Sequence, residues 1–103
     1  MDTKITVIYD NPADPDAFEN VYPDQVKLAR AMPGLQRLET SKVWPKEDGS
    51  PTPAYRFIDM YFGDYAAASA AVTTDEASRF FDSVFDLATG GVRITFAEVS
   101  QNT

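Results

Sequence analysis

The order of strand-like and helix-like segments constrains the fold of this chain more than any other feature. Four segments rich in β-branched and aromatic residues are predicted strands. They are residues 3–9, 35–44, 54–62 and 92–99. A helical region at 15–32 follows the first strand, and two helical pieces precede the last, with Asp64 near the start of one and Thr74 as the N-cap of the other. The order β-α-β-β-α-β predicts an α+β fold of the ferredoxin-like type, with a four-stranded antiparallel sheet and both helical regions on one face.

The first helical region contains a proline in its middle. Asp14 is its predicted N-cap, with Pro15 at the first helical position. Pro23 removes a backbone donor and clashes with the preceding turn, at a cost of about 3 kcal/mol in a regular helix. We therefore predict two pieces, a short one ending near Tyr22 and a main one starting near Pro23, with Gly34 as the stop signal.

Composition excludes several classes of function. The 103 residues predict one domain, 1–103, and 16 acidic against 9 basic residues give a net charge of −7. This charge disfavours nucleic acid and anionic membrane surfaces as partners. The chain has no cysteine and no histidine, which removes thiol nucleophiles, Ser–His pairs and the commonest metal ligands. We predict no metal and no cofactor, and the absence of a visible signal peptide or apolar span predicts a cytoplasmic protein.

The predicted third strand carries apolar side chains on both faces. Two sets alternate along it. One set is Arg56, Ile58, Met60 and Phe62, and the other is Tyr55, Phe57, Asp59 and Tyr61. Helices cover only one face of such a sheet, so the other face is predicted to be half apolar and open. A patch of that size is unusual on a monomer, and a second copy of the chain, sheet against sheet, is the simplest cover. The sequence thus predicts a homodimer.

The sequence resembles the EthD family of the dimeric α+β barrel superfamily. The resemblance rests on "YDNPAD" after the first strand, "PGL" after the first helix and "YFGDYAAASAAV" before the last strand. It implies two ferredoxin-like protomers that close their sheets into a barrel. Superfamily relatives include muconolactone-type isomerases, cofactor-free monooxygenases and cyclases, and haem-dependent members. Many family members carry a His-Tyr pair and a second His on the first helix. Here Tyr22 is kept, Val21 replaces the first His, and Gln25 or Val26 stands near the second. Transfer of a histidine-based mechanism, or of haem on an axial His, is therefore not supported.

Two residues are the candidate catalytic groups. Asp59, if buried between its aromatic neighbours, is predicted to act as a general acid or base together with Tyr22. The alternative for Asp59 is a structural carboxylate that pairs with Arg93 or Arg56, or reaches water at a barrel end.

Six further side chains are candidate ligand-binding groups. They are Tyr9, Gln25, Trp44, Tyr55, Tyr61 and Arg93. The tyrosines would orient a phenolic or carbonyl ligand by hydrogen bonds, and the alternative is that they fill the core. Trp44 would cap the pocket or pack at a strand edge or on a partner chain, and Gln25 would present its amide to the ligand or to solvent.

Three functions remain open from the sequence. The first is that of a cofactor-independent isomerase, cyclase or monooxygenase, which binds a small hydrophobic or aromatic metabolite between helices and sheet. The second is a non-catalytic ligand-binding or accessory dimer, which the loss of the family histidines favours. The third is a purely structural dimer with a filled interior.

Overall fold

The computed structural model describes residues 1–101 and contains the predicted order of elements, with the second helical region divided in two. The elements are β1 (Thr3–Tyr9), α1 (Pro15–Arg30), β2 (Arg37–Lys42), β3 (Arg56–Phe62), α2 (Tyr65–Ala71), α3 (Asp75–Leu87) and β4 (Val92–Glu98). The strands form one antiparallel sheet in the order β2-β3-β1-β4. The predicted ferredoxin-like α+β fold is confirmed.

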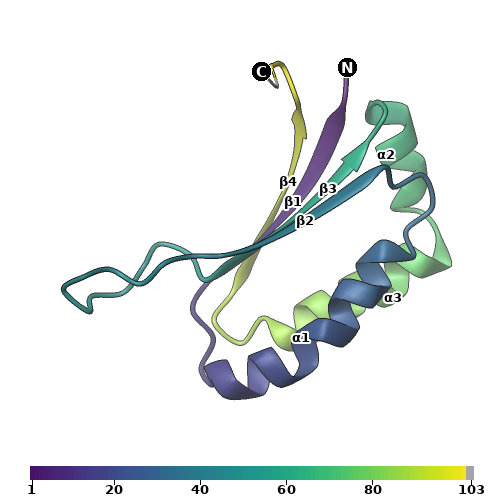
Figure 1. Ribbon diagram of the computed structural model, residues 1–103. Coiled ribbons are helices and arrows are strands. Elements are labelled where there is room, and N and C mark those ends of the chain that lie inside the picture. Colours follow the sequence, from purple (N-terminus) through teal and green to yellow (C-terminus); the bar gives the residue numbers. More distant parts are fainter. Residues whose placement is uncertain (102–103) are drawn as a thin grey trace.

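The molecule has two layers, because all three helices lie on one face of the sheet (Figure 1). Alternate residues of β1 and β3 point into the space between the layers, where Ile5, Val7, Ile58 and Met60 are wholly buried. Helices α1 and α3 pack against each other, and α2 packs on β1 and β3. The other sheet face is open in the protomer, as the strand pattern predicts.

The helix starts are where the capping residues place them. The side chains of Asp14, Asp64 and Thr74 each accept a hydrogen bond from the backbone N–H three residues along, at 3.2, 2.8 and 3.2 Å. Gly34 has a φ of +80° in the turn that follows α1, a backbone conformation that glycine adopts without strain. These local signals were readable in the sequence.

The predicted break at Pro23 is wrong. Helix α1 runs without interruption from Pro15 to Arg30, with Pro23 inside it. Pro23 lacks the N–H that would bond to the carbonyl of Glu19. However, Phe18, Tyr22 and Ala29 are buried on both sides of it, so packing against the core holds the two halves in one helix. Tertiary burial outweighs the local cost of the proline.

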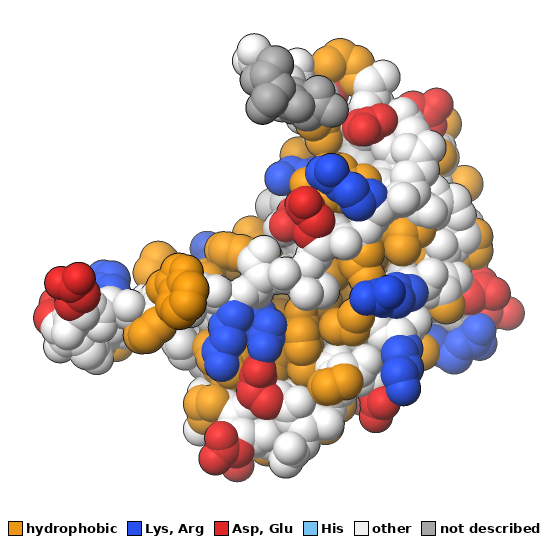
Figure 2. Space-filling model, in the orientation of Figure 1, with side chains coloured by type: hydrophobic (Ala, Val, Ile, Leu, Met, Phe, Trp, Pro, Cys, Tyr) orange, Lys and Arg blue, Asp and Glu red, His pale blue; other side chains and the backbone are white. Residues whose placement is uncertain are grey.

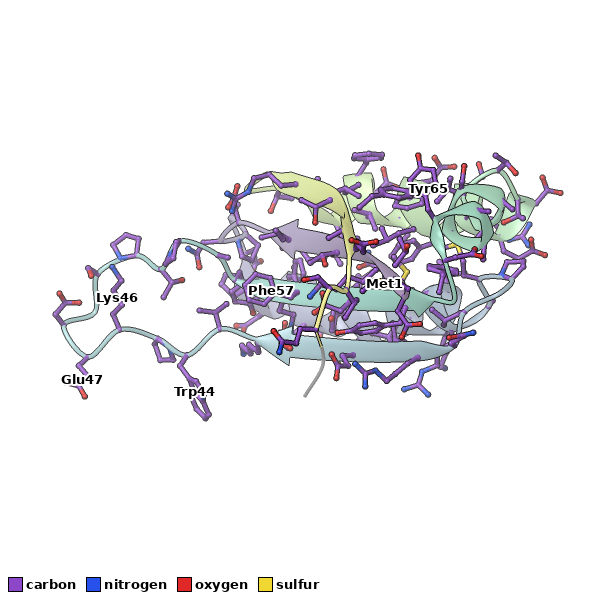
Figure 3. The ribbon with its side chains drawn as sticks, turned by 90° about the horizontal axis from the view of Figure 1, so that it is seen from above. Met1, Trp44, Lys46, Glu47, Phe57 and Tyr65 are labelled. Atoms are coloured by element: carbon purple, nitrogen blue, oxygen red, sulfur yellow. The ribbon has the colours of Figure 1, made fainter. Side chains whose placement is uncertain are left out.

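The second strand ends at Lys42, earlier than predicted, and residues 43–55 form a long arm that extends from the body (Figure 1). Its base is tied to the sheet by backbone bonds, Val43 N–H to the Tyr55 carbonyl at 2.9 Å and Tyr55 N–H to the Tyr9 carbonyl at 2.7 Å. Pro45, Pro51 and Pro53 limit the conformations of the arm. In Figure 3 Trp44, Lys46 and Glu47 lie on this arm, away from the helices.

The cap of α3 allows a first prediction. We expect Thr74→Ala to lower the free energy of unfolding by about 1 kcal/mol, because the N–H of Ala77 loses its acceptor. Thr73→Ala is the matched control, since the Thr73 hydroxyl bonds only to the Ala70 carbonyl within the preceding turn. Urea denaturation measures both, and equal losses would contradict the assigned cap.

Candidate functional site

A chain of hydrogen bonds crosses the core and joins the sheet to two helices. The Tyr9 hydroxyl on β1 donates to Oε1 of Gln25 on α1, and Gln25 Nε2 donates to Oγ of Ser83 on α3 at 3.2 Å. Tyr9 and Gln25 have no exposed surface. A buried amide needs partners for both its oxygen and its nitrogen, and here it has them from two different elements.

The chain of hydrogen bonds has a direction. Because the Ser83 oxygen accepts from the Gln25 amide, the Ser83 hydroxyl proton is left to bond to another acceptor. Successive bonds of this kind polarise one another, which strengthens the last donor. Burial raises the pKa of Tyr9 well above its usual value, so its hydroxyl stays protonated and serves as a donor.

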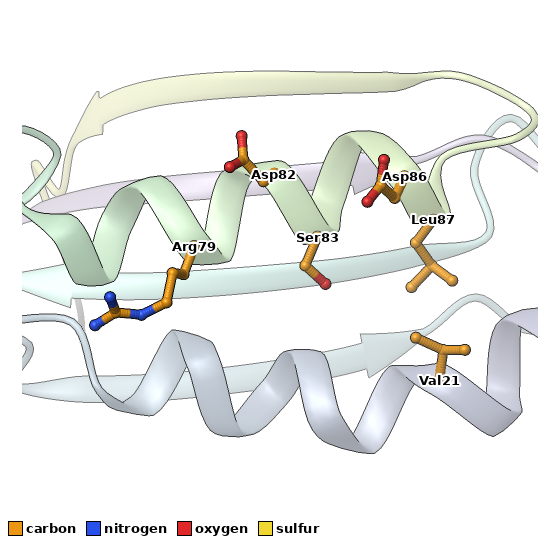
Figure 4. Close-up of a pocket in the computed structure, with 6 residues that line it drawn as sticks. All are labelled: Val21, Arg79, Asp82, Ser83, Asp86 and Leu87. Carbon is orange, nitrogen blue, oxygen red and sulfur yellow. The ribbon is translucent and has the colours of Figure 1, made fainter.

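The free side of Ser83 opens into a groove between α1 and α3 (Figure 4). Its volume is about 450 Å³, within the range of small-molecule sites. The lining residues are Val21, Arg79, Asp82, Ser83, Asp86 and Leu87. Val21 and Leu87 face each other at one end, and Arg79 lies toward the other. Ser83 points toward α1, whereas both aspartates point away from it. The groove therefore offers an apolar end, a hydroxyl donor and a guanidinium, and two carboxylates are also among its lining residues.

A second polar cluster joins the first half of α1 to the start of β3. Arg56 holds the Glu19 carboxylate in a bidentate pair, with Nη2 at 2.6 Å from Oε1 and Nε at 2.9 Å from Oε2. The Tyr55 hydroxyl donates to Glu19 Oε2 at 3.0 Å, and Lys42 Nζ lies 3.8 Å from Oε1. The hydrogen bonds from Arg56 lower the pKa of Glu19. Glu19 is thus held ionised as the centre of this cluster.

Tyr22 lies beside this cluster, under the Arg56 side chain. The Arg56 guanidinium carbon is 4.3 Å from the centroid of the Tyr22 ring, a cation–π contact. Within residues 1–101 the Tyr22 hydroxyl oxygen is buried and has no hydrogen-bond partner. Burial raises the pKa of Tyr22 to about 12, and the charge of Arg56 opposes that rise. The phenol is therefore neutral near pH 7.

Asp59 lies on the open face of the sheet. It accepts a hydrogen bond from the Thr6 hydroxyl at 2.6 Å, and Lys4 Nζ is 3.7 Å away. Its ionic partner is thus Lys4 on the neighbouring strand, rather than the predicted Arg93 or Arg56. The strand register explains both contacts, because Thr6 stands directly opposite Asp59 and Lys4, two residues away on β1, projects from the same face.

Asp59 and Tyr22 are separated by the sheet. Tyr22 projects from α1 into the layer between helices and sheet, whereas Asp59 points to the other side. Within one protomer the two candidate catalytic residues do not line a common cavity. Each stays a separate candidate.

The other predicted ligand residues are dispersed. Trp44 is 88% exposed on the arm. Tyr61 lies on the open face, where it donates to Glu39 at 2.9 Å and stacks under Arg37. Arg93 pairs with Asp10 at 3.2 Å near the base of the arm, and Tyr55 belongs to the Glu19 cluster.

The structure brings together Tyr9 and Gln25 of the predicted set and adds Ser83. Sequence reasoning missed Ser83 because the predicted core of its helix was purely apolar. A signal for the network was present, since Gln25 falls on the same helical stripe as Phe18, Tyr22 and Ala29. A polar side chain on a buried stripe requires a buried partner.

The fold is that of the ferredoxin-like α+β barrel proteins. An EthD family protein from Bacillus halodurans superposes with a TM-score of 0.87 at 24% identity, over 95% of this chain and 98% of that one. SnoaB, a cofactor-independent oxygenase from Streptomyces nogalater, gives 0.65 at 16% identity over 98% and 94%. A dimeric ferredoxin-like protein of unknown function from Jannaschia gives 0.69 at 17% identity over 96% and 100%. These likenesses confirm the fold and the resemblance to the EthD family.

The sequence places the chain in a family. It is 32% identical over 96 residues to an uncharacterized 11.0 kDa protein from the thcB–thcC intergenic region of Rhodococcus erythropolis, over 92% of each chain. The chain belongs to the same family as this protein. No family model matches the sequence.

Between residues 1 and 101, no helix combines the length and the apolar character needed to cross a membrane. The same residues contain no group of three or more carboxylates gathered as for a metal ion.

The two buried tyrosines should respond differently to loss of the hydroxyl. Tyr9→Phe leaves Gln25 Oε1 buried without a donor, so we expect the free energy of unfolding to fall by about 1–3 kcal/mol. Tyr22→Phe removes a hydroxyl that has no partner in the described chain, so we expect stability to be unchanged or higher. Guanidinium denaturation of both variants tests this contrast, and a larger loss for Tyr22→Phe would refute it.

Proposed function

We propose that this protein binds a small, partly apolar molecule in the groove between α1 and α3, and that it works as a homodimer. The observation that carries the proposal is the enclosed Tyr9–Gln25–Ser83 chain of hydrogen bonds, which ends on a hydroxyl donor in that groove. For stability alone, apolar side chains of the same shape would serve as well, and a role in positioning α1 does not account for the free hydroxyl donor at the end of the network.

The groove specifies the type of ligand. The Ser83 hydroxyl can donate to an acceptor on the ligand, such as a carbonyl, hydroxyl or ether oxygen. Arg79 is also a hydrogen-bond donor and favours the same kind of acceptor oxygen. Val21 and Leu87 favour an apolar body next to that oxygen. A small ketone or phenol with one oxygen at one end meets both requirements.

Binding is favoured over proton abstraction. Raised pKa values make Tyr9 and Tyr22 donors rather than bases near pH 7. Asp59 already accepts from Thr6 on the other face of the sheet. The best supported function is therefore the non-catalytic ligand-binding dimer.

A cofactor-independent isomerase, cyclase or monooxygenase is the second candidate. A buried neutral phenol next to the Arg56 guanidinium is a donor pair suited to a developing oxyanion, which favours Tyr22 as a catalytic residue. SnoaB, which is described as a cofactor-independent oxygenase, shares the fold. That support is analogy of fold, since one fold hosts many activities.

The open face of the sheet supports the dimer. Its half-buried apolar side chains lie around the Lys4–Asp59 pair. They are Ile8, Phe57, Tyr61 and Ala97. A second copy would cover them, and the fold is shared with a Jannaschia protein that is described as dimeric.

Acetophenone tests the groove, because it joins an apolar ring to one carbonyl oxygen. We expect it to shift the backbone amide resonances of Val21, Ser83 and Leu87 in ¹⁵N correlation spectra. Ser83→Ala should weaken this binding about fivefold, the worth of one hydrogen bond. Ser78→Ala, at an exposed position of the same helix, is the matched control. Unchanged affinity in the Ser83 variant would remove Ser83 from the site.

The dimer can be tested by placing a charge on the open face. We expect sedimentation velocity to find a dimer for the native chain and a folded monomer for Phe57→Lys, because the new charge cannot be solvated between two sheets. Phe85→Lys adds the same charge on the exposed side of α3 and should leave the dimer intact. A native chain that sediments as a monomer at high concentration would contradict the proposal.

A further inference from the structure

The arm between β2 and β3, residues 43–55, carries apolar side chains that the protomer leaves in solvent. Residues 44–51 are all exposed. Figure 2 shows apolar side chains on the arm between the body and a charged tip. Among its apolar residues are Val43, Trp44, Pro45, Pro51 and Pro53. Trp44 is the only tryptophan of the chain, and 88% of it is exposed. Tryptophan side chains are on average highly buried, so this exposure needs an explanation.

The arm is held in one conformation from its base to its tip. At the base, Nη2 of Arg93 on β4 donates to the Pro53 carbonyl at 3.3 Å. Near the tip, the N–H and the hydroxyl of Ser50 donate to the Asp48 carboxylate at 2.9 and 2.7 Å. The prolines restrict the backbone further. A partner that binds a pre-organised segment of this kind loses little free energy in ordering it.

The arm borders the open face of the sheet. Arg93 stands opposite Ile8 of that face, so its bond to Pro53 ties the base of the arm to the open side. In Figures 1 and 2 the arm and the opposite ends of the strands border a hollow on the side away from the helices. Trp44 projects past the edge that β2 forms (Figure 3). Packed sheets cross at about 30° or about 90°, so the strands of a second sheet on this face extend past that edge.

The charges of the open face suit a second copy of this chain. Cations and carboxylates alternate across the face. They are Lys4, Arg37 and Arg93, against Glu39 and Asp59. The face is therefore close to neutral, although the whole chain carries a net charge of −7. Two identical acidic chains repel each other over most of their surfaces and approach most easily where the negative charge is balanced. A strongly basic partner would instead be directed to the acidic surfaces elsewhere.

We propose that the arm of each copy packs against the body of a second copy, with Trp44 as the anchor of this contact. The inference rests on the homodimer of the proposed function and adds a contact outside the two sheets. Tryptophan is among the side chains that most often dominate the free energy of binding at interfaces. Its large ring contributes much apolar contact area. Burial against a second copy explains why an ordered arm holds Trp44 away from its own body.

The fluorescence of Trp44 tests the contact directly, because the chain has one tryptophan. We expect its emission to lie at a shorter wavelength, and acrylamide to quench it less, in the concentrated dimer than after dilution to the monomer. The Phe57→Lys variant, which is expected to be monomeric, provides the reference for a solvated Trp44. If acrylamide quenched Trp44 in the native dimer as readily as in this variant, the arm would be free and the inference would be overturned.

Removal of the ring measures what the contact contributes. Trp44→Ala should fold as the native chain does, because its side chain is 88% exposed in the protomer. We expect sedimentation equilibrium to find the dissociation constant of its dimer raised at least about tenfold. Phe85→Ala is the matched control, since it removes an aromatic ring that is 62% exposed on α3, and it should change this constant less than about twofold. An unchanged dissociation constant for Trp44→Ala would overturn the role of Trp44.

The arm contact and the homodimer fail in different ways. A native chain that stays monomeric at high concentration contradicts the homodimer and the arm contact together. A native dimer whose Trp44 is fully accessible to acrylamide leaves the homodimer in place and overturns the arm contact alone. Failure of acetophenone binding, in contrast, would concern only the groove between α1 and α3.

Discussion

One buried amide determines how the layers of this protein meet. Gln25 has no exposed surface, and both ends of its amide are bonded, the oxygen to Tyr9 of the central strand and the nitrogen to Ser83 of α3. Apolar contacts are non-directional and do not require particular pairs of atoms to meet. A buried amide does require this, because any shift leaves a polar atom without a partner. The position of α1, and with it both of its flanks, follows from this requirement.

The resemblance to the EthD family can be related to two side chains of α1. The resemblance implies that Val21 and Gln25 stand at or near positions that carry histidine in many EthD-like chains. In this structure Val21 lines the groove beside α3 and Gln25 lies in the core. An imidazole exchanges protons near pH 7, whereas an amide does not. A hydrogen-bonding side chain without acid–base chemistry near pH 7 therefore occupies this place, which supports the proposal of binding over that of proton transfer.

The features that the sequence predicted correctly are those that depend on interactions between residues close together in the chain. Strand 3–9 and the caps Asp14, Asp64 and Thr74 were found because β-branched runs and capping side chains act within a few residues. Three features were not predicted from the sequence. Pro23 did not break α1, because burial of the helix outweighed the local cost of the proline. Asp59 pairs with Lys4, because strand register decides such pairs. Ser83 bonds to Gln25, which is 58 residues away in the sequence. Each depends on contacts between distant segments.

Helix α1 separates two surfaces of opposite character. The side that faces α3 borders the groove with the Ser83 hydroxyl, and the other side carries Tyr22, whose phenol lies under Arg56 and has no hydrogen-bond partner in residues 1–101. The bidentate Glu19 pair holds Arg56 against the Tyr22 ring. Keeping a donor unsatisfied in this way has a free-energy cost that a structural role does not explain. A contact that gave the phenol an acceptor, from a ligand or from a second copy of the chain, would remove that cost.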